Sequence, residues 1–432
     1  MPSLPLLKET TIADRVMDLD RLPSGLRVDG NLALVLGSPA LSGQVVYTAA
    51  RNLFETRATK TPGGDYLLMF PTDTTQLPTA EYDWCHYGGH DHKVNDMVAF
   101  RSCDQGKTWQ GPTVAFDIDY NQHGFVPLIP RGSKRIYAFG TQPVWDLFTT
   151  ERGQGENAPI GYRYSDDDGH HWSEVRLIRP QNDPDFRGMS VMRMCETDSG
   201  AWVLGTHEGD WSYRPGVMSR QYVLRSEDQG RTWTLLPHPR HGGWRVPQYN
   251  RMDEGRPINL SGGEVYLMTR TCEGRLWATR SLDDGKTWED PAPTPLVHPD
   301  APPMLFHLAD GKTLAAFHHN RHHDLNYVNL GDNLGMKDRS EIWVSLSSDG
   351  GRSWSVPRFV LANAAAPTLA NGWFNWQCSY LDAFTDNGLL HLFVPHRWQR
   401  CLHLQLPETE LTRLPTAPEL QPGCRAATSC SN

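Results

Sequence analysis

Ser102-Cys-Asp104-Gln-Gly106-Lys-Thr-Trp109 is one copy of a pattern, S-x-D-x-G-x-x-W, that occurs five times in this chain of 432 residues. The other copies begin at Ser165, Ser226, Ser281 and Ser347, so successive copies lie 63, 61, 55 and 66 residues apart. A period near sixty residues, with strand-like runs between the copies, is typical of a radial array of similar β-sheets. Because blades of a closed ring bury a core only together, the repeat predicts one β-propeller rather than several separate domains.

Each copy has the composition of a tight turn between two strands. An aspartate such as Asp104 accepts hydrogen bonds from the backbone of its own turn, and Gly106 supplies a positive φ angle. Trp109 is large and apolar enough to pack between neighbouring sheets. Alternating runs such as Met97-Val-Ala-Phe-Arg101 precede the copies and indicate strands that lead into the turns. In the alternative, in which the aspartates are calcium ligands, the tryptophans have no role.

Charge and composition exclude several classes of function. The net charge is −9 and no basic run is present, which argues against a nucleic-acid partner. No apolar stretch approaches membrane-spanning length, and Met1 to Asp20 lacks the apolar core of a signal peptide. We therefore expect no membrane partner and a cytoplasmic location, or secretion if a leader has been removed. The eight cysteines are scattered without a CxxC pair, as in proteins with reduced thiols. The oligomeric state is not predicted.

The repeat also divides the chain. We expect an irregular lead-in over 1–25, a single six-bladed propeller over 26–406 and a partly disordered tail over 407–432. Residues 26–48 are expected to complete the last blade and so close the ring. The five blades with a repeat are expected at about 52–114, 115–180, 187–240, 250–296 and 301–361, and a sixth without one at 377–406. Insertions rich in His, Asp, Gly and Tyr interrupt the blades, and such loops commonly build the binding site of a propeller. These insertions are 71–95, 142–158, 207–220 and 318–340.

The repeats, their spacing and the six blades resemble the sialidase (neuraminidase) superfamily over essentially all of 26–406. The resemblance implies an all-β, six-bladed propeller that hydrolyses an acidic carbohydrate substrate, such as a glycoside of sialic acid or a related nonulosonic acid, without a cofactor or metal. Sialidases hold the substrate carboxylate with three arginines, whose planar guanidinium groups match a carboxylate. Arg57, ahead of Thr61-Pro-Gly-Gly-Asp-Tyr-Leu-Leu-Met-Phe70, fits the first, although Ala58-Thr59 replaces the family's Ile-Pro. Arg270 in "DEGRPINLSGGEVYLMTR" and Arg339 in "RSEIWVSLSSDGG" fit the other two.

The same resemblance implies the catalytic groups. The family's acid/base is an aspartate in a loop before the strand entering the first repeat, and Asp91 in "HDHKVNDMVAFRS" stands there, flanked by His90 and His92. A carboxyl group in a substrate-covered loop is suited to protonating a leaving oxygen. Glu254, one hairpin before the second arginine, corresponds to the glutamate that activates the nucleophile.

The nucleophile is where the chain departs from the family. Sialidases use a tyrosine in a motif resembling Tyr-Ser-x-Leu, whereas this chain reads Gln377-Cys-Ser-Tyr-Leu-Asp-Ala-Phe384. Aligning the serine and the leucine puts Cys378 at the tyrosine position, with Tyr380 two residues later. Residues i and i+2 share a face of a strand, so we assign the role to Tyr380 and keep Cys378 as the alternative. The departure leaves the reaction itself open.

Histidines provide the competing hypotheses. We expect His207 and His318, together with His90 and His92, to contact the substrate from the insertions. Imidazole and carboxylate groups would also suit a transition metal, although no spacing here is a metal signature. A histidine paired with a tyrosine would instead suit a lyase or an atypical glycosidase acting on uronic-acid glycans. A third hypothesis is a propeller that binds acidic glycans without turning them over.

Overall fold

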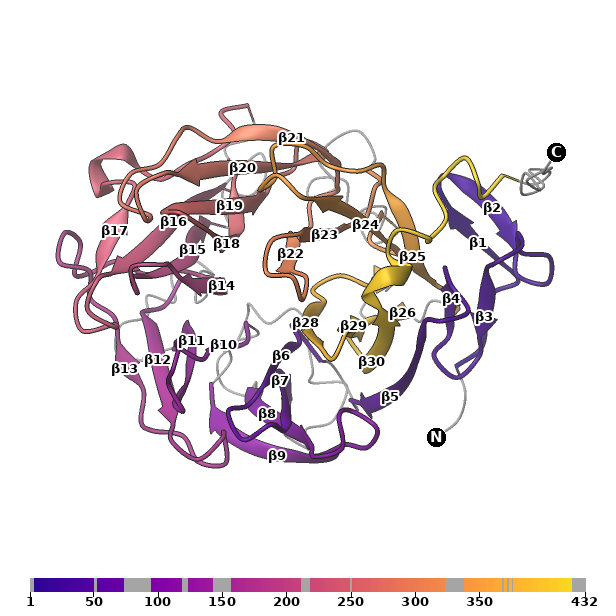
Figure 1. Cartoon of the computed structure of the whole chain (residues 1–432), viewed down its shortest axis with the longest axis horizontal. Helices are drawn as coiled ribbons and strands as arrows, with labels where there is room; N and C mark the ends of the chain where they lie inside the picture. The colour runs from indigo at the N-terminus through magenta and orange to yellow at the C-terminus, as the bar shows by residue number, and fades with distance from the viewer. Residues whose placement is uncertain are drawn as a thin grey trace.

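Six antiparallel sheets surround a common centre in the computed structural model (Figure 1). The structure describes residues 4–49, 53–73, 95–118, 123–142, 157–210, 218–248, 251–322, 338–366, 369–370, 373–374 and 376–421. Within these ranges the chain is built from strands and short helical turns, and the predicted all-β, six-bladed propeller is confirmed. None of the described helices is long and apolar enough to cross a membrane.

Each of the first five blades runs outward from an inner strand through three further strands. The first blade contains β6 (Arg57–Lys60), β7 (Tyr66–Asp73), β8 (Asn95–Ser102) and β9 (Gln110–Asp117). The second contains β10 (Val126–Leu128), β11 (Ile136–Thr141), β12 (Ile160–Ser165) and β13 (Arg176–Leu177). The third contains β14 (Ser190–Glu196), β15 (Trp202–Asp210), β16 (Met218–Ser226) and β17 (Thr234–Leu236). The fourth contains β18 (Asp253–Ser261), β19 (Glu264–Arg270), β20 (Arg275–Ser281) and β21 (Ala292–Val297). The fifth contains β22 (Met304–His307), β23 (Leu314–His318), β24 (Glu341–Ser347) and β25 (Arg358–Asn363).

The sixth blade closes the ring with a strand from the start of the chain. Its strands are β28 (Asp382–Asp386), β29 (Leu389–His396), β30 (Arg400–Pro407) and, outermost, β5 (Ser42–Thr48), which pairs antiparallel with β30. The expectation that the N-terminal part completes the last blade is thus correct for β5. The short strands β3 (Arg27–Asp29) and β4 (Leu34–Leu36) instead extend the fifth blade, because β4 pairs with β25.

Both flanking segments are more ordered than expected where the structure describes them. The lead-in forms a hairpin, β1 (Glu9–Ile12) and β2 (Arg15–Asp18), beside the fifth blade (Figure 1). Ile12 and Met17 of this hairpin are buried in one cluster with Trp343 and Phe359. After β30, the 3-10 turn η5 (Glu408–Glu410) leads to the buried Leu411. Apolar side chains therefore fix both flanks to the propeller. The remaining short elements are η4 (Pro239–His241), β26 (Leu369–Ala370) and β27 (Trp373–Phe374).

The repeated motif forms the turn that we expected. In the third blade the Ser226 hydroxyl donates to Asp228 Oδ1 at 2.9 Å and accepts from the Gly230 N–H at 2.8 Å. Asp228 Oδ1 also accepts from the Thr232 N–H at 2.8 Å, and Gly230 has a φ of +83°. Trp233 packs into a cluster that joins the second and third blades. The motif therefore both closes a hairpin and joins one blade to the blade before it.

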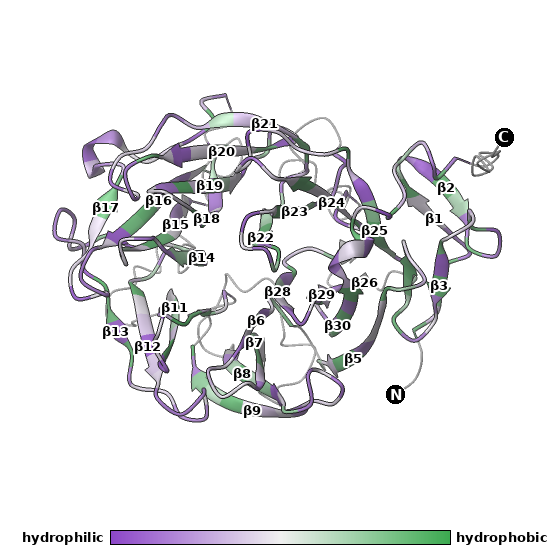
Figure 2. Cartoon of the chain, viewed as in Figure 1, coloured by the Kyte–Doolittle hydropathy of each residue, from purple (hydrophilic) through white to green (hydrophobic). Residues whose placement is uncertain are grey.

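Neighbouring blades pack against each other through the apolar side chains that alternate along their strands. Apolar residues, green in Figure 2, gather along the strands, whereas hydrophilic residues dominate the outer turns. One cluster joins the first and sixth blades through side chains that include Phe70, Phe100 and Phe393. Another joins the fifth and sixth blades around Phe317, Leu392 and Leu404. These seams hold each inner strand in place and so fix the centre of the ring.

Candidate active site

The centre of the site is a hydrogen-bonded trio from three parts of the propeller. The Tyr380 hydroxyl, just before β28, donates to Glu254 Oε1 at 2.9 Å. Arg270 Nη1 donates to Glu254 Oε2 at 2.6 Å and lies 3.3 Å from the Tyr380 hydroxyl. All three side chains are buried. The guanidinium group therefore holds the carboxylate and the phenol in one fixed arrangement.

Two unusual backbone conformations direct these side chains. Glu254 has a φ of +51° and Tyr380 a φ of +64°, both in the left-handed region that residues with a Cβ rarely adopt. The pairing of β18 with β19 shifts between Asp253 and Arg256, so Glu254 lies in a bulge opposite the end of β19, where Arg270 stands. Such strain persists only where the surrounding structure enforces it, and it clusters at functional sites.

The electrostatics of the trio assign its resting protonation state. Burial and the Glu254 carboxylate hold the pKa of Tyr380 well above its usual value, against the opposing effect of Arg270. Burial alone would raise the pKa of Glu254, but the Arg270 charge, the His207 ring and the hydrogen bond from Arg270 together outweigh it, so the pKa is lowered. At neutral pH the site therefore holds a neutral phenol beside an ionised carboxylate, and that carboxylate is placed to accept the phenol proton.

Arg57 lies in a second buried cluster on the first blade. Its Nη2 pairs with Glu55 Oε2 at 2.6 Å, and Glu55 also bonds His123 Nδ1 at 2.9 Å. Burial opposes ionisation of Glu55, but Arg57 and His123 lower its pKa to about 2. The Glu55 charge acts on both Glu254 and Tyr380, which places this cluster beside the trio.

Arg339 reaches the same region from the fifth blade. Its Nη2 donates to the backbone oxygen of Asp300, whose Oδ1 accepts from Arg270 Nε at 2.5 Å. The Arg339 charge lowers the pKa of Tyr380, as that of Arg270 does. Arg270 and Arg339 thus share one aspartate and act on one phenol, and the Glu55 partner of Arg57 acts on that phenol too.

Several supporting residues escaped the sequence analysis. Arg251 bridges Asp253 and Asp300, with its Nε 3.0 Å from Asp253 Oδ2 and its Nη1 2.8 Å from Asp300 Oδ2. Both aspartates are buried, and Arg251 and Arg270 lower their pKa values against the effect of burial. Glu55 stands two positions before Arg57, and Asp253 stands directly before Glu254. Only this closeness to a candidate residue in the sequence could have pointed to these two carboxylates.

The two candidate histidines within the described ranges have different surroundings. His207 Nδ1 accepts from the Glu254 N–H at 3.3 Å, and burial lowers its pKa to about 4, so it contacts the bulge as a neutral ring. His318 bonds the Val297 backbone oxygen and the Ser345 hydroxyl, each at 3.0 Å. Because both of its ring nitrogens are engaged inside the propeller, we do not retain His318 as a substrate contact.

The alternative nucleophile has a position unlike that of Tyr380. Cys378 is fully buried in the apolar cluster between the fifth and sixth blades, and burial raises the pKa of its thiol above the usual range. A protonated thiol in an apolar core is a poor nucleophile. The candidate acid/base Asp91 and its neighbours His90 and His92 lie outside the described residues.

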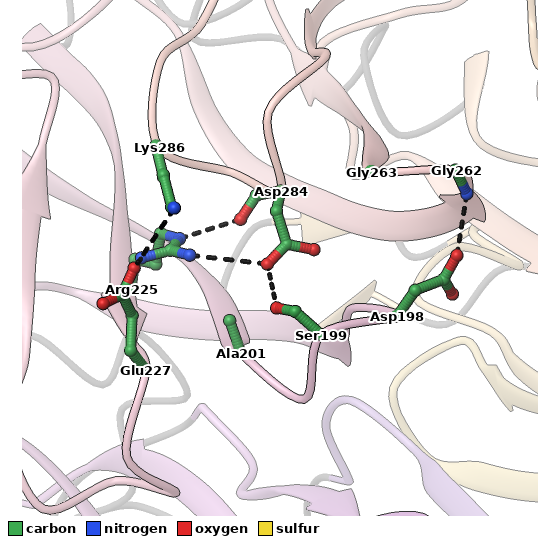
Figure 3. A pocket seen from close by; sticks show the side chains of 9 residues that line it. All are labelled: Asp198, Ser199, Ala201, Arg225, Glu227, Gly262, Gly263, Asp284 and Lys286. Atoms are coloured by element: carbon green, nitrogen blue, oxygen red, sulfur yellow. Dashed lines mark hydrogen bonds and ion pairs between the residues drawn. The ribbon is translucent and has the colours of Figure 1, made fainter.

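Within the described ranges, no group of three or more His, Cys, Asp or Glu side chains could hold a metal ion. A cavity of about 570 Å³ lies between the third and fourth blades (Figure 3). Both of its cations are paired with lining carboxylates, since Arg225 lies 2.6 Å from Glu227 and 3.5 Å from Asp284, and Lys286 lies 3.8 Å from Glu227. That cavity is therefore a polar seam between blades.

Comparison with known proteins agrees with this architecture. Residues 136–392 match the BNR repeat-like domain. The chain belongs to this family. The BNR-repeat propeller of the chain is similar in structure to the NanB sialidase of Streptococcus pneumoniae (TM-score 0.58, 12% identity, 85% of this chain and 71% of that one). It is also similar to a protein of unknown function from Dyadobacter fermentans (TM-score 0.57, 15% identity, 85% and 99%). A third similar structure is the Trypanosoma rangeli sialidase (TM-score 0.54, 12% identity, 87% and 61%). At these identities the likeness shows the sialidase-like fold alone.

Proposed function

We propose that the protein is an exo-glycosidase of the sialidase type, which releases a carboxylate-bearing sugar such as sialic acid or a related nonulosonic acid. The observation that carries the proposal is the hydrogen bond from Tyr380 to Glu254, with Arg270 bonded to both. A buried phenol beside an ionised carboxylate is the arrangement expected of an activated nucleophile. The BNR-repeat family and the sialidase-like fold agree with it.

In the proposed reaction the Tyr380 oxygen attacks the anomeric carbon as its proton passes to Glu254 Oε1. The glycosidic bond breaks, and its electron pair leaves with the aglycone oxygen, which takes a proton from Asp91. Water then cleaves the tyrosyl–sugar bond, with Asp91 accepting the water proton and Glu254 returning the phenol proton. A neutral nucleophile suits an anionic sugar because an attacking carboxylate would be repelled by the substrate's charge.

The three arginines Arg57, Arg270 and Arg339 would bind the substrate carboxylate. Arg270 and Arg339 are held in place through Asp300, and Arg57 is held by Glu55. A guanidinium fixed by a buried carboxylate loses little side-chain entropy on binding, so the site is preorganised for an anion.

The deciding experiment is covalent trapping. A difluorinated sialic acid, in which fluorine slows hydrolysis of the intermediate, is incubated with the wild-type protein and with the Tyr380→Phe and Cys378→Ala variants. We expect mass spectrometry of proteolytic fragments to find the adduct on Tyr380 in the wild type and in Cys378→Ala, and none in Tyr380→Phe.

A fluorogenic sialoside supplies the matching turnover assay. Release of free sugar supports the proposal. An unsaturated product that absorbs in the ultraviolet would replace it with a uronic-acid-glycan lyase. Binding of acidic glycans without turnover would leave a glycan-binding propeller.

A further inference from the structure

A second cavity opens at the other end of the inner strands. It has a volume of about 530 Å³, and its lining includes Arg193, Phe306 and Thr385; we call it the lower cavity. Strand β18 runs from Glu254 in the candidate active site to Ser261, which lines the lower cavity. The lining residues nearest to the trio in sequence are Pro257 and Ala383, each three positions after a trio residue and so roughly 10 Å away at about 3.3 Å per residue, and none of the trio residues lines the lower cavity.

Arg193 presents a charge to this cavity. Its Nη1 pairs with Asp382 Oδ1 at 2.6 Å, and the other oxygen of Asp382 accepts from the Ala58 N–H at 2.9 Å. The carboxylate is thereby satisfied, while the Arg193 side chain remains 28% exposed and lines the cavity. The rest of its guanidinium group is therefore available to a ligand.

Arg256 adds a second positive charge behind the cavity wall. It is 1% exposed, and none of its three guanidinium nitrogens has a hydrogen-bond partner among the residues that the structure describes. Burial, and then the Arg57 charge, lower its pKa to about 9, so it stays protonated at neutral pH. A buried cation without a hydrogen-bonded counter-ion is costly, which points to an anion that the wall is built to receive.

One aromatic ring connects the two arginines. The guanidinium carbons of Arg193 and Arg256 lie 5.1 and 5.5 Å from the centre of the Phe306 ring. Asp382 pairs with Arg193, and its charge also acts on Arg256. Arg57 and Glu55, which act on Arg256 as well, pair with each other, so these groups together carry one positive charge in excess.

The other titratable groups that line the cavity leave this excess in place. Glu196 is already matched, because its Oε2 accepts from the Arg131 N–H at 2.7 Å and lies 3.6 Å from Arg131 Nε. Burial lowers the pKa of His307, which is therefore neutral at pH 7.

We propose that the lower cavity is a second binding site, for a small organic carboxylate of about monosaccharide size. The volume falls within the range of small-molecule pockets. The excess charge selects an anion, and the open side of the Arg193 guanidinium matches a carboxylate. Phe306 and Phe384 also line the cavity and contribute apolar atoms to its wall. The site does not depend on the reaction proposed for Tyr380.

Isothermal titration with D-glucuronate, and with D-glucose as the neutral counterpart, tests this. To weaken binding at the candidate active site, the titrated protein carries Arg339→Met. We expect saturable binding of glucuronate and none of glucose. Adding Arg193→Met is expected to weaken glucuronate binding by about tenfold or more, because a charge-assisted hydrogen bond is lost. Equal binding of glucose, no binding of glucuronate, or unchanged affinity without Arg193 would overturn the proposal.

Arg193→Met leaves Asp382 without its hydrogen-bonded cation and could therefore unfold the protein. A second variant tests the cavity without disturbing this ion pair. Ala309 is exposed on a turn at the rim of the cavity, so Ala309→Trp obstructs the opening without touching the ion pair. Circular dichroism shows whether it folds as the parent does. We expect glucuronate affinity to fall by about tenfold or more in this variant too, and unchanged affinity in Ala309→Trp would refute the site.

Discussion

Tyr380 donates a hydrogen bond of 2.9 Å to Glu254 although the two residues are 126 positions apart, on different blades. Each has a left-handed backbone conformation, so the bond depends on two strained turns that meet at the centre of the ring. Arg270 bonds both partners and fixes the direction of proton transfer from the phenol to the carboxylate.

Removing the phenol oxygen tests the role of this pair. We expect Tyr380→Phe and Glu254→Gln each to lower kcat on a fluorogenic sialoside by about a thousandfold or more, because the nucleophile or its base is lost. The double variant should be little worse than either single one, since the two groups act as a unit. Cys378→Ala is the control and should keep kcat near that of the wild type. Full activity in Tyr380→Phe would refute the assignment.

Glu55 should make the protein sensitive to acid. Its pKa falls from 4.5 to about 2 on folding, so its ionised form stabilises the native state above pH 4.5. That contribution, about 3 kcal/mol at most, is lost as the pH falls from 4.5 towards 2. We expect Glu55→Gln to be less stable at neutral pH and to show a shallower decline over this window in urea unfolding. Parallel curves for the variant and the wild type would contradict the linkage.

A side chain at the glycine of the repeat should lower the stability of the protein. A Cβ on Gly285, whose φ is +81°, would lie 2.8 Å from Val203 Cγ2 on the neighbouring blade. The matched control is Gly388, which has a φ of +75° and open space around its Cβ position. We expect Gly388→Ala to cost about 1 kcal/mol from backbone strain, and Gly285→Ala to cost about 1–3 kcal/mol more. Equal losses in urea unfolding would show that the close approach has no effect.

The buried charge of Arg256 should destabilise the unliganded protein, so its removal should be stabilising. Arg256→Met keeps much of the side-chain volume and removes a buried charge that has no hydrogen-bond partner among the described residues. We expect the free energy of unfolding to rise by about 1 kcal/mol or more, measured by urea unfolding without added carboxylates. Arg352, whose side chain is 54% exposed, supplies the control, and Arg352→Met should change stability by less than about 1 kcal/mol. A loss of stability in Arg256→Met would mean that the charge is already compensated.

Local pattern was sufficient for much of the fold. The turn at Asp228 and Gly230 depends on hydrogen bonds within five residues and on one positive φ angle, both of which short-range chemistry predicts. The hairpin β1–β2 was missed because its strands are only four residues long and depend on burial of Ile12 and Met17 against a distant blade.

The candidate site divides in the same way. The resemblance indicated Glu254 and Arg270 from short motifs, and Tyr380 only as a neighbour two positions from the aligned Cys378. Arg251 and Asp300 follow no motif and come together only because the fourth blade folds between them. His318, placed in the site from its position in an insertion, instead has both ring nitrogens bonded inside the propeller.

The sequence by itself determined the number of repeated blades, their phase and the hairpin turns, because each repeat carries its own turn chemistry and alternation. The tertiary structure decided what meets at the centre. It places the Tyr380 hydroxyl against Glu254 and Cys378 in the core, and it leaves Arg256 buried behind a second cavity. Ring closure brings together residues more than a hundred positions apart, and the direction of each side chain there follows from a bulge and two left-handed residues that no local pattern encodes.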